Sequence, residues 1–192
     1  MIKTGLRLLE QFLKQGASKV EVDLPYLDEI LGAHRAIIFS EAAAYHRPFL
    51  ASRAEMYGAD IRPLLECGAF VPVSDYLQAQ RARRVIRTAW NKVLAEIDCL
   101  FTPAAPIAAP AFNETTAKLP GGEKPLVRAL LDPFLPFNYL GYPAVVMPCG
   151  VTKENMPIGL QLVGKPGQDE FLLNIATGYQ QKTEWHLAVA EV

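Results

Sequence analysis

The sequence predicts an α/β fold, in which helices pack on a sheet of short strands. Long segments rich in Ala, Leu, Glu and Arg alternate with short segments rich in Val, Ile and Leu. Near the N-terminus a helix, a glycine and a strand are predicted in succession, which is the order of an α/β unit. Hydrophobic residues make up 51% of the 192 residues and charged residues 20%, so the composition is that of a globular chain at the apolar end.

The first elements are predicted from the spacing of their hydrophobic residues. Apolar residues at helical spacing favour a helix over about 4–15, and Gly16 ends it. Residues 18–25, SKVEVDLP, alternate between apolar and charged side chains and predict a short, half-buried strand. Pro25 ends this strand because proline has no N–H group to donate to a neighbouring strand.

The next segments are predicted to be helical. Residues 27–57 are rich in Ala, Glu, Leu and Ile, and they predict a long helix with a bend at Pro48. A shorter helix over 60–70 ends at Gly68.

A third helix is predicted to begin at Ser74, which is a favourable N-cap, and to extend to about Ile97. Residues 99–103, CLFTP, then read as a buried strand that ends at a proline. Residues 103–125 are dense in Pro, Ala, Gly and Thr and predict a long loop.

The last part of the chain predicts a short helix, a hairpin and a closing helix. Residues 126–134 favour the short helix. Residues 144–150 and 158–164 are rich in β-forming residues, and Asn155 between them tolerates the positive φ of a tight turn. The closing helix is predicted over 169–181.

The serines of the chain have no surroundings that would make one of them a nucleophile. A serine hydroxyl reacts only when a nearby base and pre-aimed backbone N–H groups activate it. No serine here has a serine neighbour, and none lies in a glycine-rich turn. The four serines are Ser18, Ser40, Ser52 and Ser74. The sequence therefore predicts no catalytic residue within this chain.

Three sequence blocks nevertheless resemble the C-terminal part of the amidase signature family. They are DYLQAQRARR running on to DCLFTPAAPIAAP (75–110), PFNYLGYPAVVMPCG (136–150) and MPIGLQLVGKPGQDEFLLNIATGYQQKTEWH (156–186). The resemblance covers nearly the whole chain and about the last two-fifths of a full-length member. It implies that residues 1–192 form the C-terminal part of a single amidase domain, an α/β/α sandwich with a mixed central sheet flanked by helices.

The family includes the A subunit of glutamyl-tRNA amidotransferase, allophanate and carboxybiuret hydrolases, and fatty-acid amide hydrolases. Its members cleave or transfer from the C–N bond of an amide without a cofactor. Their triad of one lysine and two serines belongs to the N-terminal portion, and nothing in this sequence matches that stretch. The resemblance thus implies a small-molecule amide, with carboxylated amides among the candidates, but carries no catalytic residue over to this chain.

Arg62 is the leading candidate for substrate binding. In members whose substrates carry a carboxylate, an arginine resembling Arg62 helps to bind it, and the planar guanidinium can pair with both carboxylate oxygens. The alternative is a surface arginine near a helix start, whose aliphatic stem covers apolar neighbours.

Thr102, Pro103, Phe137 and Asn138 are predicted to lie near the substrate cleft, at strand ends and loop starts. Ligand crevices of α/β folds form at the carboxyl ends of strands, and the resemblance places these residues there. Asn138 has a structural alternative, which is to cap backbone groups in the PFNYLG turn. Asp132 precedes that turn, but it is one residue out of register with an aspartate that binds the substrate amino group in some relatives, so we do not predict it as a ligand.

Several functions are not supported by the sequence. The net charge of −1 and the acidic residues near the arginines of the third helix give no reason to expect nucleic acid as a partner. No stretch is apolar for long enough to span a membrane, and the three histidines have no metal-site spacing. Cys67, Cys99 and Cys149 are widely spaced, which predicts reduced, buried thiols in a cytoplasmic protein.

Three hypotheses remain from the sequence alone. The chain is the C-terminal portion of an amidase, inactive by itself and completed by an N-terminal half; or it is a non-catalytic partner that binds carboxylated molecules through Arg62; or it is the product of a truncated amidase gene that begins at an internal Met1. Uncovered sheet edges and apolar helix faces predict that the isolated chain self-associates, is marginally stable or needs a partner.

Overall fold

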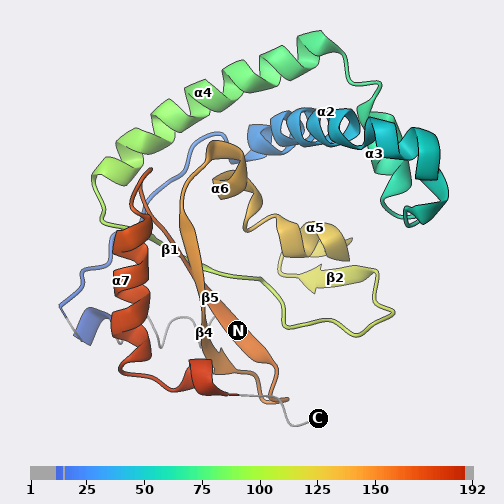
Figure 1. Cartoon of the computed structure of the whole chain (residues 1–192). Coiled ribbons are helices and arrows are strands. Elements are labelled where there is room, and N and C mark those ends of the chain that lie inside the picture. The colour runs from blue at the N-terminus through green and yellow to red at the C-terminus, as the bar shows by residue number, and fades with distance from the viewer. Residues whose placement is uncertain (1–11, 15, 189–192) are drawn as a thin grey trace. The chain divides into compact units, whose positions relative to one another are not determined.

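A computed structural model describes residues 12–14 and 16–188 of the chain (Figure 1). The chain divides into two compact units, one formed by Leu24–Trp90 and the other by residues 1–23 together with 91–192. Of the helix predicted over 4–15, only residues 12–14 fall in the described part of the chain, and they are helical. The rest of that prediction lies outside the described residues.

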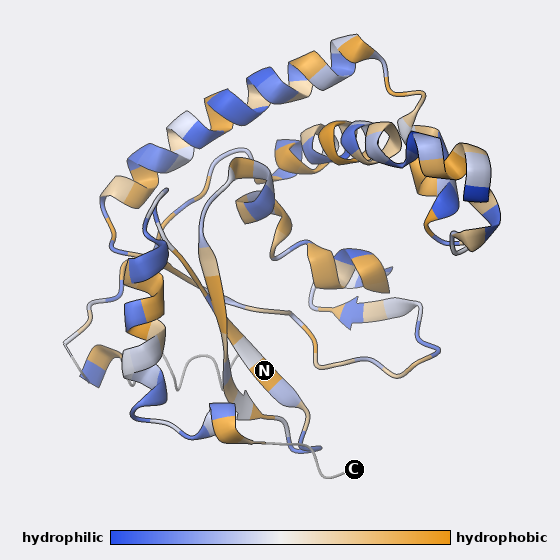
Figure 2. Ribbon diagram, viewed as in Figure 1, coloured by the Kyte–Doolittle hydropathy of each residue, from blue (hydrophilic) through white to orange (hydrophobic). Residues whose placement is uncertain are grey.

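The unit Leu24–Trp90 is built from helices. Helix α2 (Leu27–Arg53) has Pro48 inside it, and a single 3-10 turn η1 (Ala54–Met56) follows. Helix α3 (Arg62–Gly68) and most of helix α4 (Val73–Ala95) complete the unit. The three predicted helices are therefore confirmed in place and approximate length. Figure 2 shows hydrophilic and hydrophobic residues mixed along α4, as on a helix with one solvent face.

The predicted N-cap of α4 is wrong by two residues. The helix begins at Val73, and the Pro72 carbonyl oxygen accepts hydrogen bonds from the N–H groups of Asp75 and Tyr76. Ser74 therefore lies in the first turn, where its hydroxyl donates to the Asp75 carboxylate at 3.2 Å. Proline fits just before a helix because its fixed φ suits the first turn and its missing N–H has no helical acceptor there.

Two close contacts fix the helices of this unit. The Trp90 side chain of α4 is fully buried, and its Nε1–H donates to the Pro25 carbonyl oxygen at 2.7 Å. Gly68 lies directly against the backbone of α2, because a side chain there would collide with the carbonyl group of Phe39. The absence of a side chain at Gly68 lets α2 and α3 pack closely.

The second unit contains a three-stranded antiparallel sheet. Strands β1 (Leu100–Pro103), β5 (Pro157–Val163) and β4 (Ala144–Val151) lie in the order β1-β5-β4. The predicted β4–β5 hairpin is confirmed, and Asn155 in its turn has a φ of 59°. An irregularity in the pairing lies between Pro148 and Gly150.

Two predictions about strands are wrong. Residues 18–25 form no strand, because no strand of the described part of the chain pairs with them. The predicted loop over 103–125 contains a second hairpin, of β2 (Thr116–Leu119) and β3 (Gly122–Pro125). Its Pro, Gly and Thr residues are turn residues around strands of only four residues each, too short to show an alternating pattern.

The hydrophobic core of this unit lies between the sheet and α7 (Asp169–Gln180). Its buried members are Met147, Cys149, Ile158, Leu160, Leu162, Leu172, Ala176 and Tyr179. Short helices α5 (Leu126–Leu131) and α6 (Leu135–Leu140) connect the second hairpin to β4, and a 3-10 turn η2 (Trp185–Leu187) follows α7. The predicted closing helix and short helix are thereby confirmed.

The three thiols differ in exposure. All three cysteines are free: Cys149 is buried and Cys99 is half-buried, whereas Cys67 is exposed, so the prediction of buried thiols is wrong for Cys67. Burial raises the pKa of Cys149 to about 11, because the apolar core destabilises a thiolate. Cys149 is therefore a packing residue and a poor nucleophile below that pH.

We expect the free energy of unfolding to fall as pH rises from 9 towards 11, in part because of Cys149. The unfolded thiol ionises near the ordinary cysteine pKa of 9.0, while the folded thiol keeps its proton to about 11. The contribution of the Cys149 thiol to the free energy of unfolding is thus fully present below pH 9 and falls as pH rises towards 11. At about 1.4 kcal/mol per pKa unit, about 2 kcal/mol of it is lost near pH 11. Urea unfolding across this range measures it, with Cys149→Ala as the control. An equal slope in the variant would contradict the assignment.

Candidate functional site

Gln161 forms the centre of the candidate site, at the middle of the sheet. Its side chain is 1% exposed, and it is the buried polar residue of the described core. Its Nε2 amide donates to the Thr102 hydroxyl oxygen at 2.9 Å and to the Pro133 carbonyl oxygen at 3.4 Å. A buried amide is stable only when such partners satisfy it. Gln161 therefore fixes the end of β1 to the segment that connects α5 and α6.

Gln161 is not among the site residues predicted from the sequence. The available signal was one amide residue within the apolar run IGLQLVG, where β5 is the central strand and is buried on both faces. Its partners could not be read from the sequence, because Thr102 lies 59 residues away. Only the antiparallel register of β1 and β5 places Thr102 directly opposite Gln161.

The predicted cleft residues fall into two groups within this unit. Thr102 and Pro103 are the last two residues of β1, as predicted for a strand end. Phe137 and Asn138 instead lie inside α6, so their placement in a turn or loop start is wrong. Pro136 lies in the first turn of this helix, and Gly141 ends it with a φ of 75°.

The two residues of α6 differ in their exposure. Phe137 is buried, and its carbonyl oxygen accepts hydrogen bonds from the N–H groups of Gly141 and Tyr142. These backbone donors close the end of the helix. Asn138 is exposed on α6, where its own N–H group donates to the Phe134 carbonyl oxygen. The substrate-binding role of either residue stays a prediction.

Arg62 belongs to the other unit, Leu24–Trp90, as the first residue of α3. Its Nε lies 2.6 Å from Oε1 of Glu66, one turn further along the same helix. Both side chains are about half exposed. The carboxylate of Glu66 thus contacts one nitrogen of the guanidinium that the sequence predicts to bind a substrate carboxylate.

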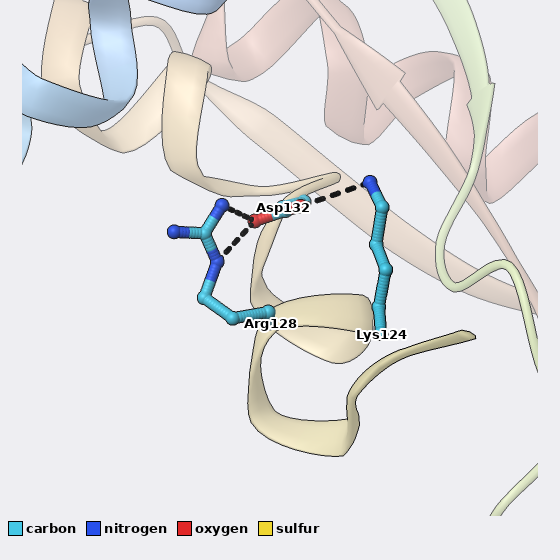
Figure 3. A network of polar contacts seen from close by, with 3 residues as sticks. All are labelled: Lys124, Arg128 and Asp132. Carbon is cyan, nitrogen blue, oxygen red and sulfur yellow. Dashed lines mark hydrogen bonds and ion pairs between the residues drawn. The ribbon is translucent and has the colours of Figure 1, made fainter. Parts of the chain in front are cut away.

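A charged group lies next to one of the partners of Gln161 along the chain. Arg128 of α5 donates from Nε at 3.0 Å and pairs through Nη2 at 2.8 Å with the same oxygen, Oδ1, of Asp132. Lys124 of β3 lies with its Nζ 3.8 Å from the other oxygen, Oδ2 (Figure 3). Asp132 immediately precedes Pro133, whose carbonyl oxygen accepts from Gln161.

The hydroxyls of three serines form local hydrogen bonds. Ser40 donates to the Ala36 carbonyl oxygen at 2.6 Å, and Ser52 donates to the Pro48 carbonyl oxygen at 3.1 Å. Ser74 donates to Asp75, as described above. The bonds of Ser40 and Ser52 to carbonyl oxygens of the preceding turn are typical of helix surfaces.

Two further features bear on other classes of site. Within residues 12–14 and 16–188, no helix is both long and apolar enough to cross a bilayer. The same part of the chain holds no group of three or more His, Cys, Asp or Glu side chains arranged to bind a metal ion. An open hollow of about 640 Å³ is lined by parts of 107–118 and by Glu123, and none of the predicted site residues lines it.

The helices and the three-stranded sheet define a mixed α/β protein. A family profile described as Amidase matches residues 3–173. The chain belongs to the amidase family. An amidase of Pseudomonas putida is 35% identical over an alignment of 182 positions, which covers 93% of this chain and 38% of that protein. The A subunit of a glutamyl-tRNA(Gln) amidotransferase of Cupriavidus pinatubonensis is 33% identical over an alignment of 211 positions, which covers 97% of this chain and 40% of the relative.

Solved structures agree with this assignment. A crystal structure of an amidase superposes with a TM-score of 0.87 at 30% identity, over 94% of this chain and 41% of that one. The allophanate hydrolase of Kluyveromyces lactis has a TM-score of 0.74 at 24% identity, over 91% of this chain and 28% of its own, and this likeness concerns the fold alone. The predicted amidase fold is therefore confirmed, and the chain spans about two-fifths of the relatives it matches.

Proposed function

We propose that this chain is the C-terminal portion of an amidase, which supplies scaffold and one wall of the substrate cleft and does not cleave amides by itself. One observation carries the proposal: almost the whole chain matches the family, yet it spans only 38% of the Pseudomonas putida relative. The four serines of the sequence also have neither a serine neighbour nor a glycine-rich turn. The reactive hydroxyl is then supplied by an N-terminal amidase segment.

The surface of the chain supports a role as part of a larger fold. Strands β1 and β4 are the outer strands of the described sheet, and Val146 of β4 is half exposed. In the helical unit, Tyr45, Met56 and Phe70 are exposed by 70%, 74% and 84% of their surface. Large apolar side chains in such numbers usually mark a surface that another segment covers. We propose that an N-terminal amidase segment covers part of it.

Restored activity tests this proposal. The chain is co-expressed with the N-terminal three-fifths of the Pseudomonas putida amidase, and ammonia release from small aliphatic amides is measured. We expect no turnover by either piece alone and turnover by the purified pair. The matched control is the pair with its nucleophilic serine, supplied by the N-terminal piece, changed to alanine, which should be inactive.

The decisive opposite result is amide hydrolysis by this chain alone. A fluorophosphonate probe should label the N-terminal piece of the active pair and leave this chain unlabelled. Labelling of a side chain of this chain, together with turnover in the absence of a partner, would show that the reactive group lies here. Binding of small carboxylates without any turnover by the pair would support the non-catalytic partner instead.

A further inference from the structure

Two helices of the chain carry charge of opposite sign. Residues 76–90 of α4 contain four arginines and no acidic residue. Residues 169–180 of α7 contain two acidic residues and no basic residue. Helix α2, by contrast, carries residues of both signs, among them Glu41 and Arg47. A segment with a single sign of charge attracts surfaces of the other sign, so α4 and α7 are candidates for a contact.

Two arginines of α4 lie on the side of the helix that faces away from its packed side. Arg81 lies four residues after Leu77 and three residues before Arg84. Val85 lies four residues after Arg81, so these four side chains share one face of the helix. All four are exposed, Leu77 by 49% and Val85 by 59%, whereas Trp90 on the opposite face is fully buried. Within residues 12–14 and 16–188, no carboxylate forms an ion pair with Arg81 or Arg84.

The acidic residues of α7 also lie away from the side of the helix that packs. Asp169 and Glu170 are exposed in its first turn, and Leu173, three residues after Glu170, is 58% exposed. Leu172 and Tyr179 are buried in the core between α7 and the sheet. No basic side chain of the described part of the chain forms an ion pair with Asp169 or Glu170. Both carboxylates complement the helix dipole and remain accessible to a cation from outside the chain.

Like charges disfavour two of the three pairings that these faces could form between copies of the chain. Pairing α4 with α4 would set arginines against arginines, and pairing α7 with α7 would set carboxylates against carboxylates. Pairing α4 with α7 sets unlike charges together, and both faces add exposed leucine or valine side chains to the contact. The lengths also match, because residues 77–88 of α4 and the 12 residues of α7 each span about 18 Å.

We propose that α4 of one copy of this chain docks on α7 of a second copy, with Arg81 and Arg84 facing Asp169 and Glu170. Two different surfaces meet in this contact, so each added copy still offers one free face. A contact along one helix of each partner is smaller than a standard interface of about 800 Å² per partner, which predicts weak, concentration-dependent self-association. The proposal goes beyond the proposed function and does not depend on amide cleavage.

Sedimentation velocity of the full chain tests this contact. We expect the average mass to rise with concentration at low salt. The dissociation constant should rise by about 10-fold or more between about 0.05 and 0.5 M NaCl, because the Debye length falls from about 14 Å to about 4 Å. The double variants Arg81→Glu/Arg84→Glu and Asp169→Lys/Glu170→Lys should each raise it by about 10-fold or more, because like charges would then face each other.

Exchange of the charges between the two helices separates a specific contact from a loss of folding. In an equal mixture of the two double variants, every contact between unlike chains again joins opposite charges, so the mixture should associate more tightly than either variant alone. The chain with all four changes has the net charge of the wild type and should associate as the wild type does. Arg35→Glu/Arg47→Glu is the matched control, since it makes the same change of charge at exposed positions of α2 and should leave the dissociation constant unchanged.

Several results would overturn the proposal. A monomer at every concentration would do so, as would self-association that neither double variant weakens or that the control on α2 weakens equally. If the charge changes weaken assembly with the N-terminal amidase piece but not self-association, that piece covers these faces instead of a second copy. If Arg81→Glu/Arg84→Glu loses only the binding of an RNA duplex and self-associates as before, α4 is a nucleic-acid surface and the proposal is wrong.

Discussion

Gly68→Ala is expected to destabilise the helical unit by about 3 kcal/mol or more, as overpacking against an immovable neighbour does. The added Cβ would lie 2.1 Å from the carbonyl oxygen of Phe39, 2.7 Å from its carbonyl carbon and 3.0 Å from the Cβ of Ala43. Two of these three atoms belong to the backbone of α2 and cannot rotate away. Helices α2 and α3 must therefore separate to accommodate one methyl group.

Gly32→Ala is the matched control, and its expected effect has the opposite sign. Gly32 lies inside α2, and a Cβ there would meet nothing within 4 Å. Alanine favours a helix over glycine by about 1 kcal/mol, so this variant should be slightly more stable than the wild type. Urea unfolding followed by far-ultraviolet circular dichroism measures both variants. Equal effects at the two positions would show that α2 and α3 do not pack as described.

Trp90→Ala is expected to reduce the free energy of unfolding by about 4 kcal/mol, as removal of a large buried aromatic does. The Trp90 ring is fully buried, and its Nε1–H donates to the Pro25 carbonyl oxygen at 2.7 Å. The variant loses apolar burial, leaves a cavity and removes that donor together. Trp90→Phe keeps much of the volume but loses the hydrogen bond, so its expected loss is about 1 to 3 kcal/mol.

The chain offers a convenient readout for the tryptophan series. It contains two tryptophans, and the second, Trp185, is 41% exposed. In a Trp185→Phe background, fluorescence reports Trp90 alone, and its emission should be that of a ring shielded from water until the helical unit unfolds. A water-exposed emission spectrum from native Trp90, or no change of stability in Trp90→Ala, would contradict the described core.

The sequence predicted the elements whose signals are local. The helices followed from hydrophobic spacing and from glycines at their ends, such as Gly68. The β4–β5 hairpin followed from two β-rich runs and from Asn155, whose predicted positive φ is confirmed by its value of 59°. The strand predicted over 18–25 failed because a strand exists only with a partner, and no local pattern shows whether one is present.

The candidate site was predictable only in part, for a related reason. The position of Thr102 and Pro103 at a strand end could be read from CLFTP, since proline ends a strand. The helix that contains Phe137 and Asn138 was missed, although Pro136 and Gly141 mark its two ends. The contacts of Gln161 with Thr102 and Pro133 join segments that are distant along the chain, so they depend on the folded register.

The turn at Asn155 helps to determine toward which face of the sheet the amide of Gln161 points. Side chains alternate between the two faces of a strand, so a slip of one residue would point this amide to the wrong side of the sheet. The left-handed turn and the irregularity between Pro148 and Gly150 determine the register in which β4 and β5 pair. The register of the hairpin therefore also sets which residues of β5 lie opposite β1.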